Sequence, residues 1–200
     1  MIKLILVRHA LTVDNQNSRL SGHIDSVISE EGKKQIHKIT KYLKNFNIDK
    51  IYTTTSSRTK DTIKKLSELK SIDIIEKESL KEISFGDFEG LTFKEIEDKY
   101  PEEFQDMITK GYEYKYPNGE SLIDSYNRVC TELDNIISNN DGQTILICSH
   151  GGTIRNIITY LISNSYKYHW NFKIDNGSVT ILEIQDGFAV ITTMNNTSFI

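Results

Sequence analysis

The sequence contains few of the residues that cross-link or interrupt a fold: two cysteines, two prolines and one tryptophan among 200 residues. Cys130 and Cys148 both lie in apolar stretches, so we expect buried, reduced thiols, and two cysteines are too few for a zinc site. The N-terminal apolar run ends at Arg8, too early for a signal peptide or a membrane span. These absences predict a cytoplasmic protein that does not enter membranes.

An excess of one charge is also missing. The chain has 24 basic and 28 acidic residues, and no stretch gathers the basic ones into a surface for nucleic acid or anionic lipid. Arginine is scarce as well, because only five of the 24 basic residues are arginines. Since lysine is the default cation here, each arginine marks a place where a planar, forked donor is needed. These are Arg8, Arg19, Arg58, Arg128 and Arg155.

What remains is the pattern of one α/β domain spanning 1–200. Buried strands are predicted at 2–7, 50–54, 72–75 and 144–148, and amphipathic helices follow from Ser29, Ser57, Ser121 and Gly151. Strands near 178–184 and 188–193 flank an Asp-Gly turn and predict a closing hairpin. The alternation predicts a three-layer α/β/α fold around a mostly parallel sheet.

This rhythm breaks between residues 82 and 117, which contain both prolines and predict two short helices with loops. We expect a small helical cap insertion at about 83–117. Tyr112, Tyr114 and Tyr116 alternate within it, and they either line a pocket or pack the insertion onto the sheet. A second aromatic run, from Tyr166 to Phe172, is expected to belong to the core or to a homodimer contact.

Histidine and arginine follow the predicted strands where ligands of parallel α/β sheets bind. The first strand ends at Arg8-His9, a late strand ends at Ser149-His150, and Arg58 follows the second strand. Each of these residues alone is most simply structural, but together they predict a cationic pocket for a phosphoryl dianion. A metal site is disfavoured, because no His-x-His or His-x-x-x-His spacing occurs and the arginines would repel a cation.

A phosphoryl pocket with a neutral histidine points to covalent catalysis through phosphohistidine, which requires no cofactor. Such a reaction also needs an acid for the leaving oxygen and a base for water. Glu82 ends an extended run just before the predicted cap, and it is the carboxylate best placed to reach the same edge.

The motifs around these residues resemble those of the histidine phosphatases, the phosphoglycerate mutase-like superfamily. They occur in family order across nearly the whole chain, and four of the five arginines fall on motif positions. The matching segments are Arg8-His9-Ala10-x-Thr12-x-x-Asn15, Arg19-Leu-Ser21-Gly22-x-x-Asp25, Ser56-x-Arg58-x-x-x-Thr62, Leu80-x-Glu82-Ile-x-Phe-Gly86, Pro117-Asn-Gly119-Glu120-Ser121 and Ser149-His150-Gly151-Gly152-x-Ile-Arg155.

The resemblance implies a role for each matching residue. His9 is the expected nucleophile, Glu82 the proton donor and later the base, and Arg8, Arg58 and His150 the groups that hold the phosphoryl oxygens. Further phosphate or substrate contacts are expected from Asn15, Ser21, Gly22 and the amide of Gly151. Three positions depart from the family pattern: Ala10 replaces a glycine, Leu11 a common glutamate, and Ser21 a frequent glutamine.

Within the superfamily, the residues after Glu82 resemble the phosphatase branch, which includes α-ribazole phosphatases, fructose-2,6-bisphosphatases and broad-specificity phosphatases. The resemblance therefore implies a phosphatase that acts on a small phosphorylated metabolite, with α-ribazole phosphate and sugar phosphates as candidates. Two alternatives stay open at this point: a mutase that retains the phosphoenzyme, and a catalytically silent phospholigand-binding domain. The presence of both His9 and Glu82 disfavours the silent domain, because binding alone needs no acid.

Overall fold

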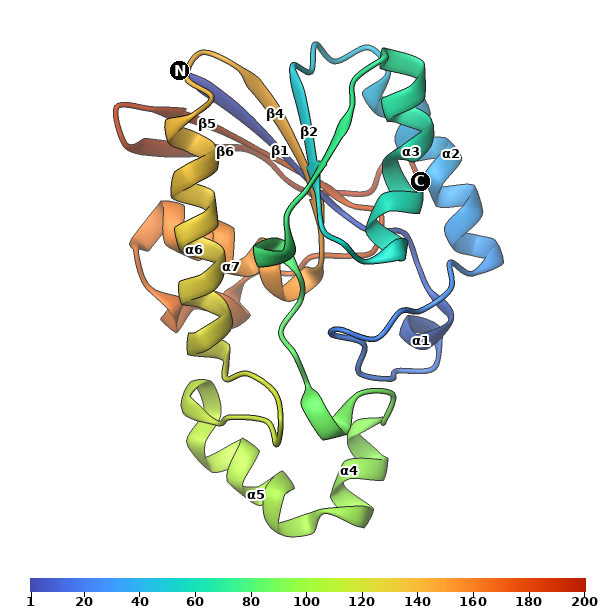
Figure 1. The fold of residues 1–200 in the computed structure, drawn as a ribbon, viewed down its shortest axis with the longest axis vertical. Helices are drawn as coiled ribbons and strands as arrows, with labels where there is room; N and C mark the ends of the chain where they lie inside the picture. Colours follow the sequence, from blue (N-terminus) through green and yellow to red (C-terminus); the bar gives the residue numbers. More distant parts are fainter.

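A computed structural model describes residues 1–200 and contains one six-stranded sheet with strand order β3-β2-β4-β1-β5-β6. The first four strands in this order run parallel, and β5 and β6 are antiparallel to their neighbours. The predicted mostly parallel sheet is therefore confirmed, with helices on both faces (Figure 1). The strands are β1 (Ile2–Arg8), β2 (Lys50–Thr53), β3 (Ile74–Glu76), β4 (Thr144–Ser149), β5 (Val179–Gln185) and β6 (Phe188–Asn196).

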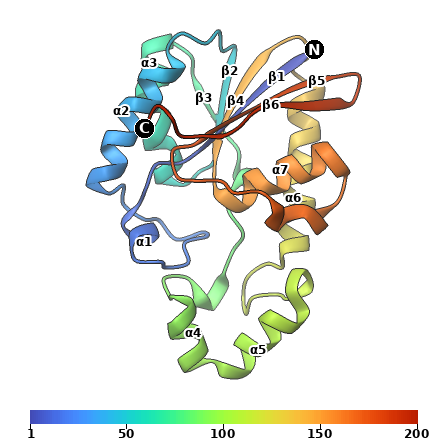
Figure 2. The same ribbon diagram turned by 180° about the vertical axis from the view of Figure 1, so that it is seen from behind.

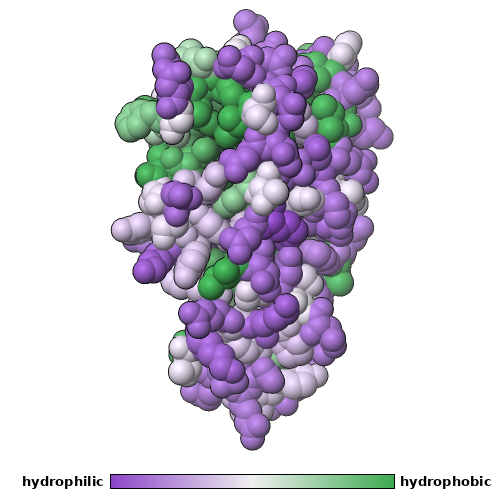
Figure 3. All heavy atoms as spheres, turned by 60° about the vertical axis from the view of Figure 1, so that its left-hand side comes forward, coloured by the Kyte–Doolittle hydropathy of each residue, from purple (hydrophilic) through white to green (hydrophobic).

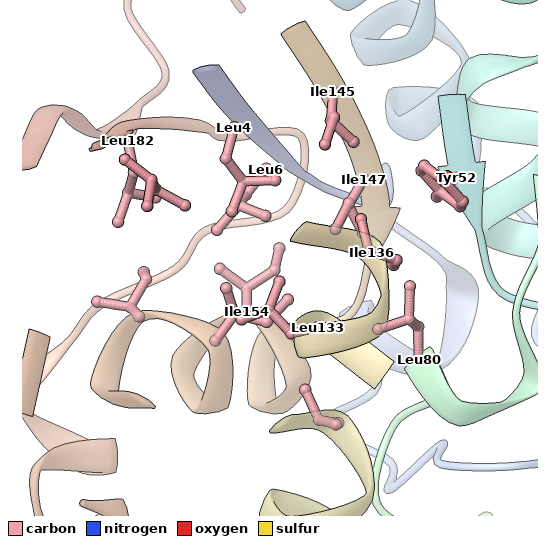
Figure 4. Packing of buried hydrophobic residues seen from close by; sticks show 14 of the residues in the cluster. Leu4, Leu6, Tyr52, Leu80, Leu133, Ile136, Ile145, Ile147, Ile154 and Leu182 are labelled. Carbon is pink, nitrogen blue, oxygen red and sulfur yellow. The ribbon is translucent and has the colours of Figure 1, made fainter. Parts of the chain in front are cut away.

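Alternating side chains of the central strands divide the core into two clusters. Leu4 and Leu6 of β1 face one side of the sheet, whereas Ile5 and Val7 face the other. The first side is covered by α6 (Leu122–Ser138) and α7 (Gly151–Ser163), and Figure 4 shows their side chains meeting those of β1 and β4. The second side is covered by α2 (Glu30–Leu43) and α3 (Ser57–Lys70). Both layers are needed because the central strands are apolar on both faces.

Local capping explains where several helices begin. The hydroxyl of Ser29 accepts the N–H of Gly32 at the start of α2, and Ser121 forms a reciprocal capping box with Asp124 at the start of α6. The polar stretch before α2 contains a short helix that the sequence analysis did not predict, α1 (Val13–Gln16). It forms because Thr12 and Asn15 make a capping box. The third strand begins at Ile74, two residues later than predicted, because α3 and its left-handed end at Ser71 extend further.

Residues 83–117, called the cap segment from here on, lie beyond the sheet layers (Figure 2). They contain α4 (Phe93–Lys99) and α5 (Pro101–Lys110), the two short helices that were predicted, and three short 3-10 turns lie in or near them. The segment has its own small cluster of buried side chains, Phe88, Ile96 and Tyr114. On the face in Figure 3 its outer surface is mainly hydrophilic.

The ends of the cap segment are joined to each other. The N–H of Asp87 donates to the carbonyl of Pro117, and the N–H of Glu120 donates to the carbonyl of Ser84. Gly86 has a φ of +52°, and a Cβ there would lie 1.9 Å from the Pro117 oxygen. A glycine is therefore required where the two ends cross.

Both cysteines are buried and unpaired, as the sequence predicted. Burial raises the pKa of the Cys130 thiol to about 12 and also raises the pKa of Cys148. None of the helices combines the length and the apolar character needed to cross a membrane.

The packing between α6 and the sheet generates a stability prediction. Leu133→Ala removes a fully buried side chain from the cluster shared by α6, α7 and the sheet, so the free energy of unfolding should fall by about 2–5 kcal/mol. Urea unfolding measures this change. The matched control is Leu69→Ala, whose side chain on α3 is 56% exposed and should cost about 0.5 kcal/mol or less. Equal losses for both variants would contradict the described core.

Candidate active site

Three neighbouring parallel strands bring the predicted histidines and arginines to one edge of the sheet. Strand β4 lies between β1 and β2, and Arg8 pairs with Ser149 in the register of β1 and β4. The N–H of His9 donates to the carbonyl of Ser149, which continues the ladder by one residue. The rings of His9 and His150 then meet edge to face, with centroids 5.2 Å apart.

The ring of His9 is held in one tautomer. Its Nδ1 lies 2.8 Å from the carbonyl oxygen of Ala10, and because a carbonyl can only accept, Nδ1 must carry the hydrogen. The Nε2 lone pair is therefore free. Burial lowers the pKa of His9 well below its usual 6.5, and the charges of Arg58 and Arg8 lower it further. The side chain is a neutral imidazole in a buried position.

Arg58 is buried to 1% exposure and is held almost entirely by main-chain oxygens. Its guanidinium donates to the carbonyls of Ser21, Gly22 and Ile24 at 2.7–2.9 Å. Its Nε donates to Nδ1 of His150 at 3.3 Å. Of its five N–H groups, four are thus used, and one on Nη1 is left for a ligand.

His150 is neutral like His9, because burial and the charge of Arg58 hold its pKa well below 6.5. Its Nδ1 accepts from Arg58, so its Nε2 carries the hydrogen and faces the hydroxyl of Thr54 at 3.2 Å. Both contacts are long for hydrogen bonds to nitrogen. A phosphoryl oxygen at His150 would have to compete with Thr54.

Arg8 shows the clearest unfilled donor capacity. Its Nη1 donates to the carbonyl of Ile174 at 2.7 Å, but its Nε is buried and has no hydrogen-bond partner. A Cβ on Gly151 would lie 3.3 Å from both Cζ and Nε of Arg8, so the guanidinium lies directly against the start of α7. The amide of Gly151 heads that helix, where N–H groups have no intrahelical acceptor. An unpaired buried donor beside such an amide favours an anion.

Glu82 follows a 3-10 turn (Glu78–Leu80) and not the extended run that was predicted, and the carbonyls of residues 79–82 are all held by side chains. The hydroxyl of Ser149 donates to the carbonyl of Leu80, and the hydroxyl of Thr153 to that of Lys81. Arg128 of α6 donates to the carbonyls of residues 79, 81 and 82. Because residues 79–82 pair with no strand, their carbonyls need other hydrogen-bond donors. The side chains of Ser149, Thr153 and Arg128 supply them and thereby fix the backbone that leads to Glu82.

The carboxylate of Glu82 lies at the start of α7. Its Oε2 accepts the N–H of Gly152 at 2.9 Å, and its Oε1 accepts the N–H of Ile83 at 3.1 Å. A Cβ on Gly152 would lie 2.3 Å from Oε1 of Glu82. The two glycines after His150 therefore allow two close contacts of helix α7. Gly151 lies against Arg8, and Gly152 lies against Glu82.

Three other predicted contacts lie close to the site but are used differently. Asn15 is linked to His9 through Asn176. The Nδ2 of Asn176 donates both to the Oδ1 of Asn15 and to the carbonyl of His9. The hydroxyl of Ser21 donates to Asp14, and the N–H of Gly22 donates to Glu89, so neither group is directed to a ligand.

The structure thus gives Ser21 and Gly22 a supporting role in place of the predicted substrate contact. Their carbonyls hold Arg58. The close packing of this loop on the cap segment explains why the amide of Gly22 is taken, because a Cβ there would lie 2.0 Å from the carbonyl of Ile83.

A cavity of about 330 Å³ lies between Glu82 and the cap segment. Tyr114 and Tyr116 line it, in agreement with the first interpretation, and they pack within the cap cluster and not onto the sheet. Tyr112 donates to the carbonyl of Lys167 outside the lining. In the second aromatic run, Phe172 packs on the core, but Trp170 lines the cavity and is 65% exposed. Trp170 therefore lies outside the core, and the homodimer contact expected for this run stays a prediction.

Two arginines outside the predicted site residues prove to be part of its structure. Arg128 holds the Glu82 segment, and Arg155 lines the cavity. The scarcity of arginine was the available signal for both, because the chain otherwise uses lysine, and Arg155 also lies on a motif position.

The buried histidines generate a prediction about pH. Burial lowers the pKa of His169 to about 3, and it also lowers the pKa of His9 and His150. The unfolded chain binds these protons near pH 6.5 and the folded chain does not, so stability is greatest above pH 6.5 and falls as the pH falls. As the pH falls from 6.5 to 5, each of these histidines should lower the free energy of unfolding by up to about 1.4 kcal/mol per pH unit.

Urea unfolding at a series of pH values measures that slope. In His169→Gln, the unfolded chain binds one proton fewer because one buried histidine is gone. Below pH 6.5, the free energy of unfolding should therefore depend on pH with a smaller slope, reduced by the contribution of one proton. An identical slope in wild type and variant would show that His169 is protonated in the folded protein.

Comparison with known proteins agrees with this geometry. Residues 4–197 match the model of the histidine phosphatase superfamily (branch 1). Phosphoserine phosphatase 1 of Hydrogenobacter thermophilus is 32% identical over 197 residues, which cover 98% of this chain and 93% of that protein. The metal-independent phosphoserine phosphatase of Arabidopsis thaliana is 28% identical over 199 residues, covering 98% and 82% of the two chains.

Solved structures show the same fold. A putative α-ribazole-5'-P phosphatase from Escherichia coli superposes with a TM-score of 0.93 at 22% identity, over 98% of this chain and 96% of that one. A phosphoserine phosphatase from Entamoeba histolytica, solved with 3-phosphoglyceric acid, gives a TM-score of 0.86 at 26% identity over 100% and 99% of the chains. With its family motifs gathered at one sheet edge, the chain belongs to branch 1 of the histidine phosphatase superfamily and is a phosphoric monoester hydrolase.

Proposed function

We propose that this phosphatase hydrolyses small phosphomonoesters without a metal, through a phosphorylated His9. The observation that carries the proposal is the state of His9: a neutral ring, with Nδ1 bonded to the Ala10 carbonyl and the Nε2 lone pair free, near the charges of buried Arg58 and half-buried Arg8. A neutral imidazole is the form that attacks phosphorus. The arginines would repel a metal ion, and they supply the positive charge that such an ion would otherwise provide.

In the first step, Nε2 of His9 attacks phosphorus, and the bond to the leaving oxygen breaks as the P–N bond forms. Arg8, Arg58 and the amide of Gly151 stabilise the charge on the phosphoryl oxygens. Protonated Glu82 gives its proton to the leaving oxygen, and the alcohol departs.

In the second step, water attacks the phosphorus of phospho-His9 from the side that the alcohol has left. Glu82, now a carboxylate, takes a proton from this water, the P–N bond breaks, and inorganic phosphate is released. The amides of Gly152 and Ile83 hold the two oxygens of Glu82 in place for this step.

The substrate proposal follows from the relatives together with the size of the cavity. Phosphoserine is the first candidate, because phosphoserine phosphatases match across almost the whole chain at 26–32% identity. α-Ribazole phosphate and sugar phosphates remain candidates from the sequence motifs. A cavity of about 330 Å³ suits a small leaving group, since sites for small molecules typically start near this volume.

The experiment compares wild type with His9→Ala and Glu82→Gln after EDTA treatment, using phosphoserine, α-ribazole phosphate, 3-phosphoglycerate and p-nitrophenyl phosphate. His9→Ala should lower kcat at least about 10³-fold, because no other group replaces the nucleophile. Rapid quench of wild type and labelled substrate into alkaline detergent should trap an alkali-stable, acid-labile phosphoenzyme. Glu82→Gln should slow phosphoserine much more than p-nitrophenyl phosphate, whose leaving group needs no proton.

Turnover by His9→Ala at the wild-type rate would eliminate the phosphohistidine proposal. Loss of activity on EDTA treatment, restored by a divalent metal, would eliminate metal independence. Isomerisation of 3-phosphoglycerate without release of phosphate would favour the mutase alternative.

The contact of Gly152 with Glu82 generates a separate prediction. Gly152→Ala suits the helix better than glycine, yet its methyl group must displace the carboxylate of Glu82. We expect unchanged or slightly higher thermal stability, with kcat for phosphoserine reduced about 10- to 100-fold and a smaller loss for p-nitrophenyl phosphate. Equal losses on both substrates would show that the glycine does not act through the acid.

A further inference from the structure

Arg155 is the one cationic side chain in the lining of the cavity beside Glu82. It lies on the first turns of α7, four residues after Gly151, so it faces the leaving group and not the phosphoryl group. The mechanism above gives it no task. A charged group that is placed in a largely apolar cavity needs a reason, because desolvation disfavours it and lowers the pKa of Arg155.

The guanidinium of Arg155 is held in place but is not saturated. Its Nε donates to the carbonyl of Phe172 at 2.8 Å, and its Cζ lies 5.3 Å from the centroid of the Trp170 ring. Its two terminal amino groups have no protein partner. The bond to Phe172 and the contact with Trp170 fix the fork, and its outer donors remain available.

The rest of the lining provides no charge to neutralise Arg155 apart from the acid itself. Glu82 is the one carboxylate in the lining, and it forms no ion pair with Arg155 within 4.0 Å. His169 is neutral, since burial and the charge of Arg155 lower its pKa to about 3. The walls contributed by the cap segment, including Phe93, Met107 and Ile108, are apolar. In such surroundings a pair of opposite charges is screened much less than in water.

We propose that Arg155 binds a second anionic group on the leaving alcohol, so that the preferred substrates are phosphomonoesters of small hydroxy acids. This inference rests on the proposed function, because it concerns the substrate of the same reaction. A carboxylate fits the planar fork in a bidentate manner, and a second phosphoryl group shares that chemistry. Arg155 is thus a specificity-determining residue that acts on the part of the substrate remote from phosphorus.

The test uses pairs of substrates that differ only in the second anion. Phosphoserine is compared with phosphoethanolamine, 3-phosphoglycerate with glycerol 3-phosphate, and fructose 1,6-bisphosphate with fructose 6-phosphate. For wild type, kcat/KM should be at least about tenfold higher for the anionic member of one or both carboxylate pairs, because a charge-assisted hydrogen bond is lost in its partner. A preference confined to the bisphosphate pair would identify a phosphoryl group as the second anion.

In Arg155→Gln, this ratio should fall close to one, whereas Arg155→Lys should keep part of it. The matched control is Lys167→Gln, which removes one positive charge from an exposed position on the same 3-10 helix as Trp170 and should keep the wild-type ratio. If Arg155→Gln melts well below wild type, Trp170→Leu is used in its place. The ratio of the two kcat/KM values should then fall by less, because Arg155 remains and only loses its contact with the Trp170 ring.

A wild-type ratio near one for all three pairs would overturn the proposal, and so would an equal loss for both members of a pair in Arg155→Gln. A failure of the proposed function is seen separately, as p-nitrophenyl phosphate turnover that survives His9→Ala. Turnover that depends on His9, together with ratios that do not depend on Arg155, would reject this inference alone.

Discussion

The site depends on two guanidinium groups that have no carboxylate partner, the buried one of Arg58 and the half-buried one of Arg8. The arginines that form ion pairs are Arg19 and Arg128, whereas Arg8 and Arg58 are held by carbonyl oxygens. Carbonyl dipoles solvate a guanidinium but do not cancel its charge, so a positive potential persists at the sheet edge. Burial is the main reason why the pKa values of His9 and His150 are low, and this potential lowers them further. The same potential favours a negatively charged group at the sheet edge.

All five arginines donate to main-chain carbonyls, which gives their scarcity a physical meaning. The acceptors lie in loops and extended segments that have no strand partner and whose carbonyls need other donors. A planar fork serves two or three such acceptors at once, which a lysine ammonium on a flexible stem does less well. The contacts run from Arg8 to Ile174, from Arg19 to Gly90, from Arg58 to Ser21, Gly22 and Ile24, from Arg128 to Ser79, Lys81 and Glu82, and from Arg155 to Phe172.

The sequence predicted those parts of the fold that depend on local periodicity. The strands, the main helices and the break between residues 82 and 117 follow from apolar spacing, and the position of His9 and His150 at neighbouring strand ends follows from the parallel topology. Contacts between distant segments could not be predicted in this way. Arg128 and Glu82 are 46 residues apart, and the amide of Gly22 is taken by Glu89, 67 residues away. No local pattern encodes which loop a side chain will meet, so the supporting roles of Ser21, Gly22 and Arg155 emerge only in three dimensions.

The attachment of Glu82 separates the chemistry from the choice of substrate. Its backbone is held by Ser149, Thr153 and Arg128, which belong to β4, α7 and α6, and its carboxylate is held by the start of α7. The acid therefore moves with the sheet and its helices, as His9 does, and not with α4 or α5. The cap segment supplies apolar walls to the cavity, and its one hydrogen bond to the Glu82 carboxylate comes from the N–H of its first residue, Ile83. Changes in those walls can alter which leaving group fits while the geometry between His9 and Glu82 is preserved, so one reaction can serve relatives that differ in substrate.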